Sequence, residues 1–190
     1  MARVLNTDPG TVFGTYCETY IGHSTKLPVV RLRYRGPNQN CPLLNKGKCL
    51  VHVNKPVVCA LYPLGRFLQT KNMDTDRSYL REITYILMPI VCGSQRKKQT
   101  VQSWLERFDI PVDDKFFFQW QDLILSLLTK METINSRNYS DETMNLFYNA
   151  VLAGLYLHYE VGKDFLGQFA QNAQQLEALF DRLLICDLQG

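Results

Sequence analysis

Apolar residues recur every three or four positions through the second half of the chain, which is the spacing of helices that bury one face. Residues whose side-chain oxygens can accept hydrogen bonds from backbone amides precede these stretches, as expected at helix starts. We predict a short helix from Val101 to Phe108 capped by Thr100, a long helix beginning at Asp113 and Asp114, a third beginning at Ser140, and a last one over about Lys163–Leu184. The inward stripes of the three long helices are Phe117, Trp120, Ile124, Leu127 or Leu128, and Met131; Met144, Phe147, Val151 and Leu155, with His158 as a further candidate; and Phe165, Phe169, Ala173, Leu176, Phe180 and Leu183. Three amphipathic helices with short connections predict a helical bundle over residues 100–190.

The first half of the chain has shorter apolar segments, separated by proline, glycine and asparagine. Asp8-Pro9 is a helix start and predicts a helix over Pro9–Tyr20. The alternating run Val29–Arg35 predicts a strand with its arginines on one face. We also expect a short strand at Cys49–His52, no long regular element over Val57–Gly65, and a buried strand over Glu82–Val91. The sequence therefore predicts an α+β protein, in which a small irregular cysteine-rich domain with short strands, residues 1–99, precedes the helical bundle.

Length and composition are those of an ordinary globular protein. The chain has 190 residues, of which 46% are apolar and 21% charged. That is enough for one domain, or two small ones, with a buried core. No apolar run approaches the ~20 residues of a membrane-spanning helix, and the first residues show no secretory signal peptide. We therefore expect a cytoplasmic protein without a membrane partner.

Charge and cysteine content both divide the chain near Gln99. Residues 1–99 hold 15 Lys and Arg against 5 Asp and Glu, whereas residues 100–190 hold 6 against 13. Five of the six cysteines lie in the basic half. In a reducing cytoplasm, clustered cysteines are more often metal ligands or redox groups than disulfides.

Three of these cysteines are separated by turn-forming residues that can fold the chain back on itself: Cys41, Cys49 and Cys59. Thiolates are soft ligands for zinc or iron, and a closed tetrahedral site needs four of them. Cys92, after the apolar strand, is the expected fourth ligand, with Cys17 and His52 as alternatives. Nearby cations would offset the charge of about −2 that four thiolates leave around a divalent ion, although a solvated basic face explains them equally well. The spacing alone also fits three unrelated thiols buried in a core.

The residues around these cysteines form three short motifs: Cys41-Pro42-Leu43-Leu44, Gly47-Lys48-Cys49-Leu50-Val51-His52, and Lys55-Pro56-Val57-Val58-Cys59-Ala60-Leu61-Tyr62-Pro63. Together they resemble the YkgJ-like cysteine-cluster family, described as a zinc- or iron-chelating domain. Cys92-Gly93 and the segment Thr100–Glu106 are similar to a later part of its longer members. The resemblance implies that Cys41, Cys49 and Cys59, together with Cys92, chelate zinc, iron or an iron–sulfur centre.

The family pattern begins with a further cysteine cluster ahead of a helix, whereas no cysteine precedes Cys17 here. We interpret Met1 as an internal methionine and expect the native protein to carry the cluster upstream. In a chain that lacks it, the metal site is expected to be incomplete or empty. An in-frame stop codon a few codons upstream of Met1 would contradict this interpretation.

Other function classes stay open. Arginines on one face of the strand Val29–Arg35 could contact phosphates, as in a basic nucleic-acid-binding module. Some members of the wider family are associated with lysine methylation of flagellin, so an accessory or catalytic role in a protein-methylation system is a third alternative, although no glycine-rich cofactor loop is visible. The sequence assigns no catalytic residue and leaves open whether the chain is an enzyme. It equally leaves open a homodimer through the aromatic-rich segment Phe116–Trp120.

Overall fold

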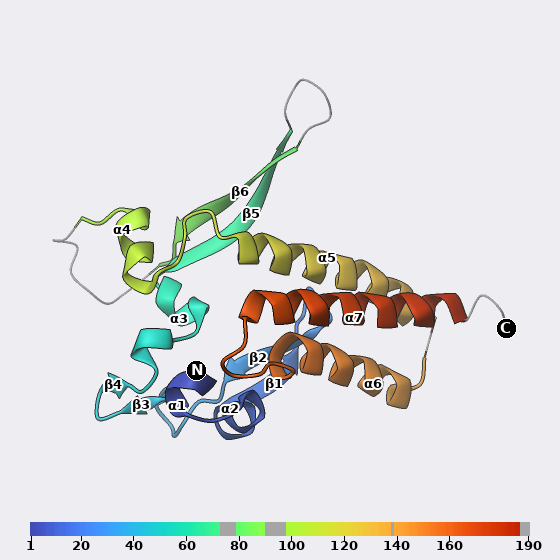
Figure 1. Ribbon diagram of the computed structural model, residues 1–190, viewed down its shortest axis with the longest axis horizontal. Helices are drawn as coiled ribbons and strands as arrows, with labels where there is room; N and C mark the ends of the chain where they lie inside the picture. Colours follow the sequence, from blue (N-terminus) through green and yellow to red (C-terminus); the bar gives the residue numbers. More distant parts are fainter. Residues whose placement is uncertain (73–78, 90–97, 138, 187–190) are drawn as a thin grey trace. The chain divides into compact units, whose positions relative to one another are not determined.

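The computed structural model describes residues 1–72, 79–89, 98–137 and 139–186 (Figure 1). Within these ranges the chain forms seven α-helices and three antiparallel sheets of two strands each. The predicted α+β class, with short strands and a helical half, is confirmed. None of the helices in this part of the chain is long and apolar enough to cross a membrane.

The chain divides into two compact units, each described by itself below. Unit 1 comprises residues 1–52 and 122–190, and unit 2 comprises residues 53–121. The second boundary falls within helix α5, Lys115–Ser136. The division expected at residue 99 stays a prediction, because residues 90–97 lie outside the described residues.

Unit 1 begins with two helices and a strand pair. Helix α1 spans Ala2–Leu5, α2 spans Pro9–Tyr16, β1 spans Cys17–Ile21 and β2 spans Pro28–Leu32. The predicted start of α2 is confirmed, since the two carboxylate oxygens of Asp8 accept hydrogen bonds from the amide and the hydroxyl of Thr11, at 2.9 and 2.5 Å.

The end predicted for this first helix is wrong. After Tyr16 the chain is extended and pairs with β2, from Cys17 opposite Leu32 to Ile21 opposite Pro28. Threonine, tyrosine and isoleucine in this segment suit a pleated strand, and the ladder bonds to β2 outweigh the helical periodicity. The strand predicted over Val29–Arg35 is confirmed as far as Leu32, where β2 ends.

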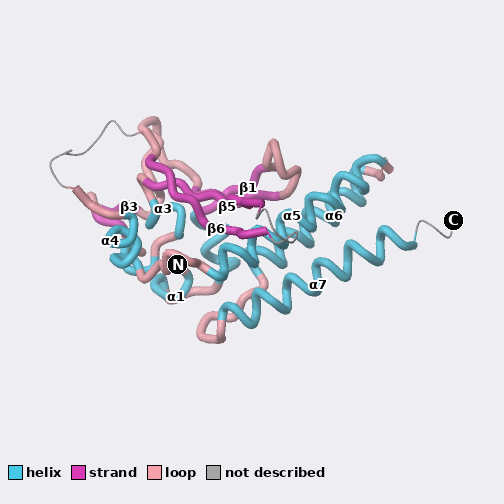
Figure 2. Tube along the Cα trace, turned by 90° about the horizontal axis from the view of Figure 1, so that it is seen from above, coloured by secondary structure: helices cyan, strands magenta, loops and turns pink. Residues whose placement is uncertain are grey.

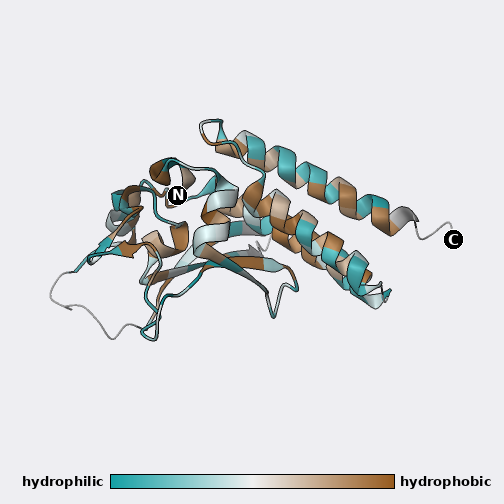
Figure 3. Cartoon of the chain, turned by 90° about the horizontal axis from the view of Figure 1, so that it is seen from below, coloured by the Kyte–Doolittle hydropathy of each residue, from teal (hydrophilic) through white to brown (hydrophobic). Residues whose placement is uncertain are grey.

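The part of unit 1 that begins at residue 122 is mainly helical. It contains residues 122–136 of α5, α6 over Asp141–Leu152 and α7 over Phe165–Cys186. The predicted positions Leu127, Met131, Phe147, Val151, Phe169, Leu176 and Phe180 are buried. Two details of the predicted stripes are wrong. On α5 the buried residues include Leu123 and Ile134, whereas Ile124 is only half-buried, and Phe165, at the start of α7, is 47% exposed because it lies in the first turn, ahead of the packed part of the helix. Figures 1 and 2 show the three helices with nearly parallel axes, and in Figure 3 the helix that leads to the C terminus alternates between hydrophobic and hydrophilic colours. The predicted packing of amphipathic helices against one another is confirmed.

Specific contacts hold α7 to its neighbours. The rings of Phe147 and Phe180 lie 5.6 Å apart between α6 and α7. Between α5 and α7, Ser126 Oγ donates to Glu177 Oε1 at 2.8 Å, and Lys130 Nζ lies 2.7 Å from Asp181 Oδ1. Polar pairs at the edge of the apolar stripe therefore help to determine which face of α7 packs against α5.

Helix α6 continues into a π-helical turn, η3, over Ala153–Leu157. The amide of His158 donates to the carbonyl of Ala153 at 2.9 Å, the wider spacing of a π-turn. A Cβ atom at Gly154 would lie 2.7 Å from Leu176 Cδ1, so only glycine lets α7 approach this turn so closely.

Unit 2 combines a β-hairpin with short helices. Its elements are α3 over Val57–Leu61, β5 over Leu64–Asn72, β6 over Tyr79–Leu87, α4 over Val101–Leu105, a 3₁₀ turn η2 over Glu106–Phe108, and the first residues of α5. The short helix and its cap are confirmed, because Thr100 and Ser103 form a capping box. The strand predicted over Glu82–Val91 starts and ends earlier, as β6, and its end at Ile86 and Leu87 is exposed rather than buried. Its partner β5 was not predicted.

Candidate functional site

Cys49 lies on the second strand of a tight hairpin in unit 1, and Cys41 precedes the first strand, in a turn closed by the bond from the Leu44 amide to the Cys41 carbonyl at 3.1 Å. Strands β3, Leu44–Asn45, and β4, Lys48–Cys49, pair with Leu44 opposite Cys49. The two residues of the loop, Lys46 and Gly47, both have positive φ angles, which is the geometry of the commonest two-residue hairpin turns and favours glycine. The strand predicted at Cys49–His52 is confirmed only at Cys49, since His52 opens a 3₁₀ turn, η1, over His52–Asn54.

The hairpin is anchored by its apolar residues and leaves its cysteines near the surface. Leu43 and Val51 are buried, and the amide of Leu50 donates to the carbonyl of Leu43 at 2.9 Å. Cys41 and Cys49 are half-buried thiols. The chain thus reverses at Lys46 and Gly47, as the turn residues predict, and Leu44–Asn45 pairs with Lys48–Cys49.

Cys59 lies on α3 of unit 2, where it is exposed. Its neighbours Ala60 and Leu61 are buried, and their carbonyls both accept from Trp104 Nε1 at 3.1 Å. Cys92, the expected fourth ligand, lies outside the described residues.

No three Cys, His, Asp or Glu side chains in the described ranges form a group that could hold a metal ion. Of the four thiols that a closed tetrahedral site needs, Cys41 and Cys49 lie in unit 1, whereas Cys59 lies in unit 2. Of the alternative ligands, Cys17 is buried in β1, and this burial raises the pKa of its thiol, against the opposing effect of Arg33. A metal-binding thiolate is disfavoured at that position.

The three arginines considered for nucleic-acid binding are not equivalent in the structure. Arg31 lies on β2, where its Nε is 2.7 Å from Glu18 Oε1 on the opposite strand and its guanidinium lies over the ring of Tyr20. Arg33, beyond the end of the strand, donates to the carbonyl of Cys17 at 2.8 Å. Two of the three cations are thus engaged within unit 1.

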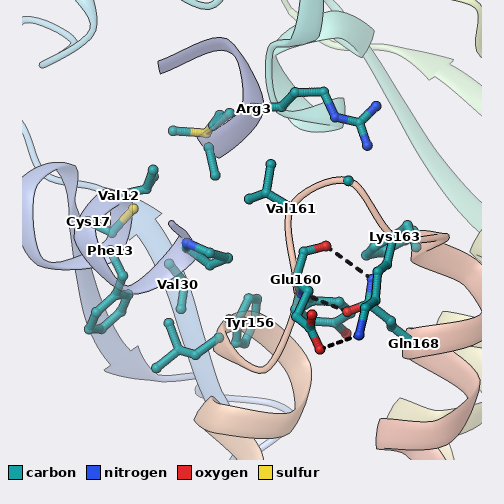
Figure 4. Close-up of a pocket in the computed structure, with 17 residues that line it drawn as sticks. Arg3, Val12, Phe13, Cys17, Val30, Tyr156, Glu160, Val161, Lys163 and Gln168 are labelled. Atoms are coloured by element: carbon teal, nitrogen blue, oxygen red, sulfur yellow. Dashed lines mark hydrogen bonds and ion pairs between the residues drawn. The ribbon is translucent and has the colours of Figure 1, made fainter. Parts of the chain in front are cut away.

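Unit 1 also contains a pocket of about 330 Å³ that no sequence pattern predicts. It lies where α1 and α2, the β1–β2 pair and residues 156–168 meet (Figure 4). Figure 4 shows Val12, Phe13 and Cys17 on one side and Glu160, Lys163 and Gln168 on the other, with Val161 between the two sides. A second hollow, of about 530 Å³, shares Arg3 and Val161 with it and extends to Asn6 and Asp8.

The polar groups of the pocket are held in place by one another. Lys163 Nζ lies 2.7 Å from Glu160 Oε1, and the Glu160 amide donates to Gln168 Oε1 at 2.7 Å. The hydroxyl of Tyr159 donates to the carbonyl of Gly154 in the π-turn at 3.2 Å. Burial raises the pKa of both Tyr156 and Tyr159, partly opposed by their hydrogen bonds to the Val30 backbone and to Asn172, so both hydroxyls are neutral at neutral pH.

No sequence motif marks this pocket, because its residues come from segments more than a hundred positions apart. The one local signal is the end of the apolar periodicity of α6 at the run Tyr156–Gly162, where aromatic residues are followed by a glycine with a φ angle of 104°. Such a run is equally typical of an ordinary helix end, so it does not by itself predict a pocket.

Comparison of the chain with family models, with curated proteins and with solved structures gives no match. The resemblance to the YkgJ-like cysteine-cluster family therefore stays a prediction from the cysteine motifs.

Proposed function

We propose that this chain is a metal-binding protein of the cysteine-cluster type, which holds zinc or iron, including iron in an iron–sulfur centre, through Cys41, Cys49, Cys59 and Cys92. The proposal rests on the cysteine motifs and on the exposure of the thiols. It assigns no reaction.

The observation that carries the proposal is the contrast between the cysteines of the motifs and Cys17. Free cysteine in a core behaves as a small apolar residue and is among the most buried residue types. Cys17 fits that description, with 8% of its surface exposed, whereas Cys41 and Cys49 are only half-buried and Cys59 is exposed. The alternative of unrelated core thiols is therefore disfavoured for all three.

The local structure of the hairpin supports the same function. The loop at Lys46 and Gly47 turns the chain between the two cysteines, and Lys46 and Lys48 are exposed beside Cys49. Positive charge near thiolates favours their ionised form and offsets the negative charge of a thiolate-bound metal. Thiols that bind metal must stay reduced, so we also propose that the protein works in the cytoplasm.

Metal analysis of anaerobically purified protein, before and after reconstitution with zinc or ferrous iron and sulfide, tests this function. The double variant Cys41→Ser, Cys49→Ser removes both thiols of the hairpin and is expected to reduce bound metal to background, because two remaining thiolates cannot close a tetrahedral site. Cys17→Ala is the matched control, since it removes a buried thiol of the same unit, and is expected to keep the metal.

Two results would reject the proposal: a wild-type chain that takes up no metal on reconstitution, or a double variant that keeps the same metal content as the control. The optical spectrum then identifies the metal. Iron–sulfur centres absorb in the visible range, whereas zinc, with a filled d shell, does not.

A further inference from the structure

We propose that the pocket of unit 1 binds a small carboxylate with an apolar body, and that Arg3 pairs with the carboxylate group. Cys41, Cys49 and Cys59, the described cysteines of the proposed metal site, do not line this pocket, so the two proposals are tested independently.

The walls of the pocket favour an apolar body. Val12, Phe13, Val30 and Phe165 line it, and its volume of about 330 Å³ is within the range of small-molecule sites. Figure 4 shows Val12 and Phe13 on one side, with Val30 and Tyr156 toward the strand pair. Burying an aliphatic or aromatic group against these side chains removes apolar surface from water on both partners, which supplies the binding energy.

The charges on the lining favour an anionic head group. Glu160 forms an exposed ion pair with Lys163, so these two charges balance each other, and the hydroxyls of Tyr156 and Tyr159 carry no charge at neutral pH. Within the described residues the guanidinium of Arg3 has no side-chain partner, although it lines both this pocket and the adjoining hollow.

Two acidic residues line the adjoining hollow: Glu160, which is paired with Lys163, and Asp8, whose carboxylate is already bonded to Thr11 at the start of α2. Among the described side chains of the lining, Arg3 is therefore the cation that no carboxylate pairs with, and a carboxylate matches its planar pair of donors better than a hydroxyl does.

The pocket is also formed before a ligand arrives. The π-turn Ala153–Leu157 carries Tyr156 and Leu157 into the lining, and the bond from Tyr159 to Gly154 fixes the chain where it leaves this turn. On the opposite wall, Gln168 accepts from the amide of Glu160 and donates to its carbonyl, at 2.7 and 3.3 Å, which holds this part of the chain in place. Side chains already held in one arrangement lose little freedom on binding, which raises affinity. Single π-turns of this kind occur frequently at functional sites.

Isothermal titration of the full chain with octanoate, and in parallel with octan-1-ol, tests the inference. The wild type is expected to bind octanoate at one site and more tightly than the alcohol. Arg3→Gln removes the positive charge from an exposed position, so it is not expected to affect folding, and should weaken octanoate binding about tenfold while leaving octan-1-ol unchanged. Arg182→Gln, an exposed arginine of α7 outside the pocket, removes the same charge and should change neither.

A second variant tests the position of the apolar body. Val161 is exposed and lines the pocket, so Val161→Trp places a large ring there without disturbing the core, and should weaken both ligands at least about tenfold. Four results would overturn the inference: no saturable binding of octanoate by the wild type, equal binding of octanoate and octan-1-ol, equal losses in Arg3→Gln and Arg182→Gln, or full binding by Val161→Trp.

Discussion

At the scale of single residues, a largely buried ion pair in unit 2 joins Arg66 on β5 to Asp114 at the start of α5. Arg66 Nη1 lies 2.7 Å from Asp114 Oδ2, with only 9% and 14% of the two side chains exposed. The guanidinium also lies 4.1 Å from the ring centre of Phe117. The other oxygen of Asp114 accepts from the amides of Phe116 and Phe117. Asp114 therefore both caps α5 and compensates a largely buried cation.

Asp114→Ala is expected to destabilise unit 2 by about 3 kcal/mol, because it leaves the charge of Arg66 uncompensated in a poorly solvated position and removes the cap of α5. Both tryptophans, Trp104 and Trp120, belong to unit 2, so their fluorescence during urea unfolding reports on this unit. The exposed neighbour Asp113→Ala is the control and should stay within about 0.5 kcal/mol of the wild type. Equal losses in the two variants would contradict the assigned role of Asp114.

At the scale of elements, the π-turn η3 and helix α7 pack closely because Gly154 has no side chain. The three nearest atoms to a Cβ atom built there all belong to Leu176, at 2.7 to 3.1 Å, and Leu176 is itself buried with 4% exposed. Gly14 in α2 is the opposite case, because a Cβ atom there would meet nothing within 4 Å. The same substitution should therefore have opposite effects at the two glycines.

Gly154→Ala is expected to lower the stability of unit 1 by about 2 kcal/mol, since Leu176 must leave its position in the core to avoid overlap. Gly14→Ala is expected to raise it by up to about 1 kcal/mol, because alanine has the higher helix propensity. Thermal denaturation followed by far-ultraviolet circular dichroism compares the two variants with the wild type. Shifts of the melting temperature in the same direction would contradict the packing described for η3 and α7.

At the scale of the whole molecule, three tyrosines spread over both units respond to pH in the same sense. Burial raises the pKa of Tyr85 in unit 2 and of Tyr156 and Tyr159 in unit 1 above the ordinary tyrosine value of 10.0. In the unfolded chain these hydroxyls ionise at their ordinary pKa, hence at lower pH than in the folded chain. Their contribution to stability is therefore complete below pH 10.0 and is lost as the pH rises through the raised pKa values.

We expect the free energy of unfolding, measured by urea titration, to fall above this pH by at most about 1.4 kcal/mol per pH unit for each tyrosine. The double variant Tyr156→Phe, Tyr159→Phe should be less stable at neutral pH, because it loses the bond from Tyr159 to Gly154, yet show a shallower decline in alkali. The ultraviolet absorbance of tyrosinate measures the ionisation directly. An identical alkaline decline in wild type and variant would contradict the assignment of these two pKa shifts.

Local signals predicted much of the helical half. Thr100 and Ser140 cap the helices that follow them, and the apolar stripe of α7 at Phe169, Leu176 and Phe180 is buried as its spacing predicts. These features depend on residues a few positions apart, so they can be read from a single chain. The turn at Lys46 and Gly47 between two of the motif cysteines is of the same kind.

The sequence by itself determined the α+β class, the starts of the helices and the placing of Cys41 and Cys49 on either side of a turn, because caps, periodicity and turn residues act over short stretches of chain. Only the tertiary structure decided that Cys17–Ile21 is a strand, that Leu64–Asn72 pairs with β6, and that Arg3, Val30 and Tyr156 line one pocket. Strand pairing and pocket walls arise from contacts between distant segments, whose free energy overrides local propensity and leaves no pattern in either segment alone.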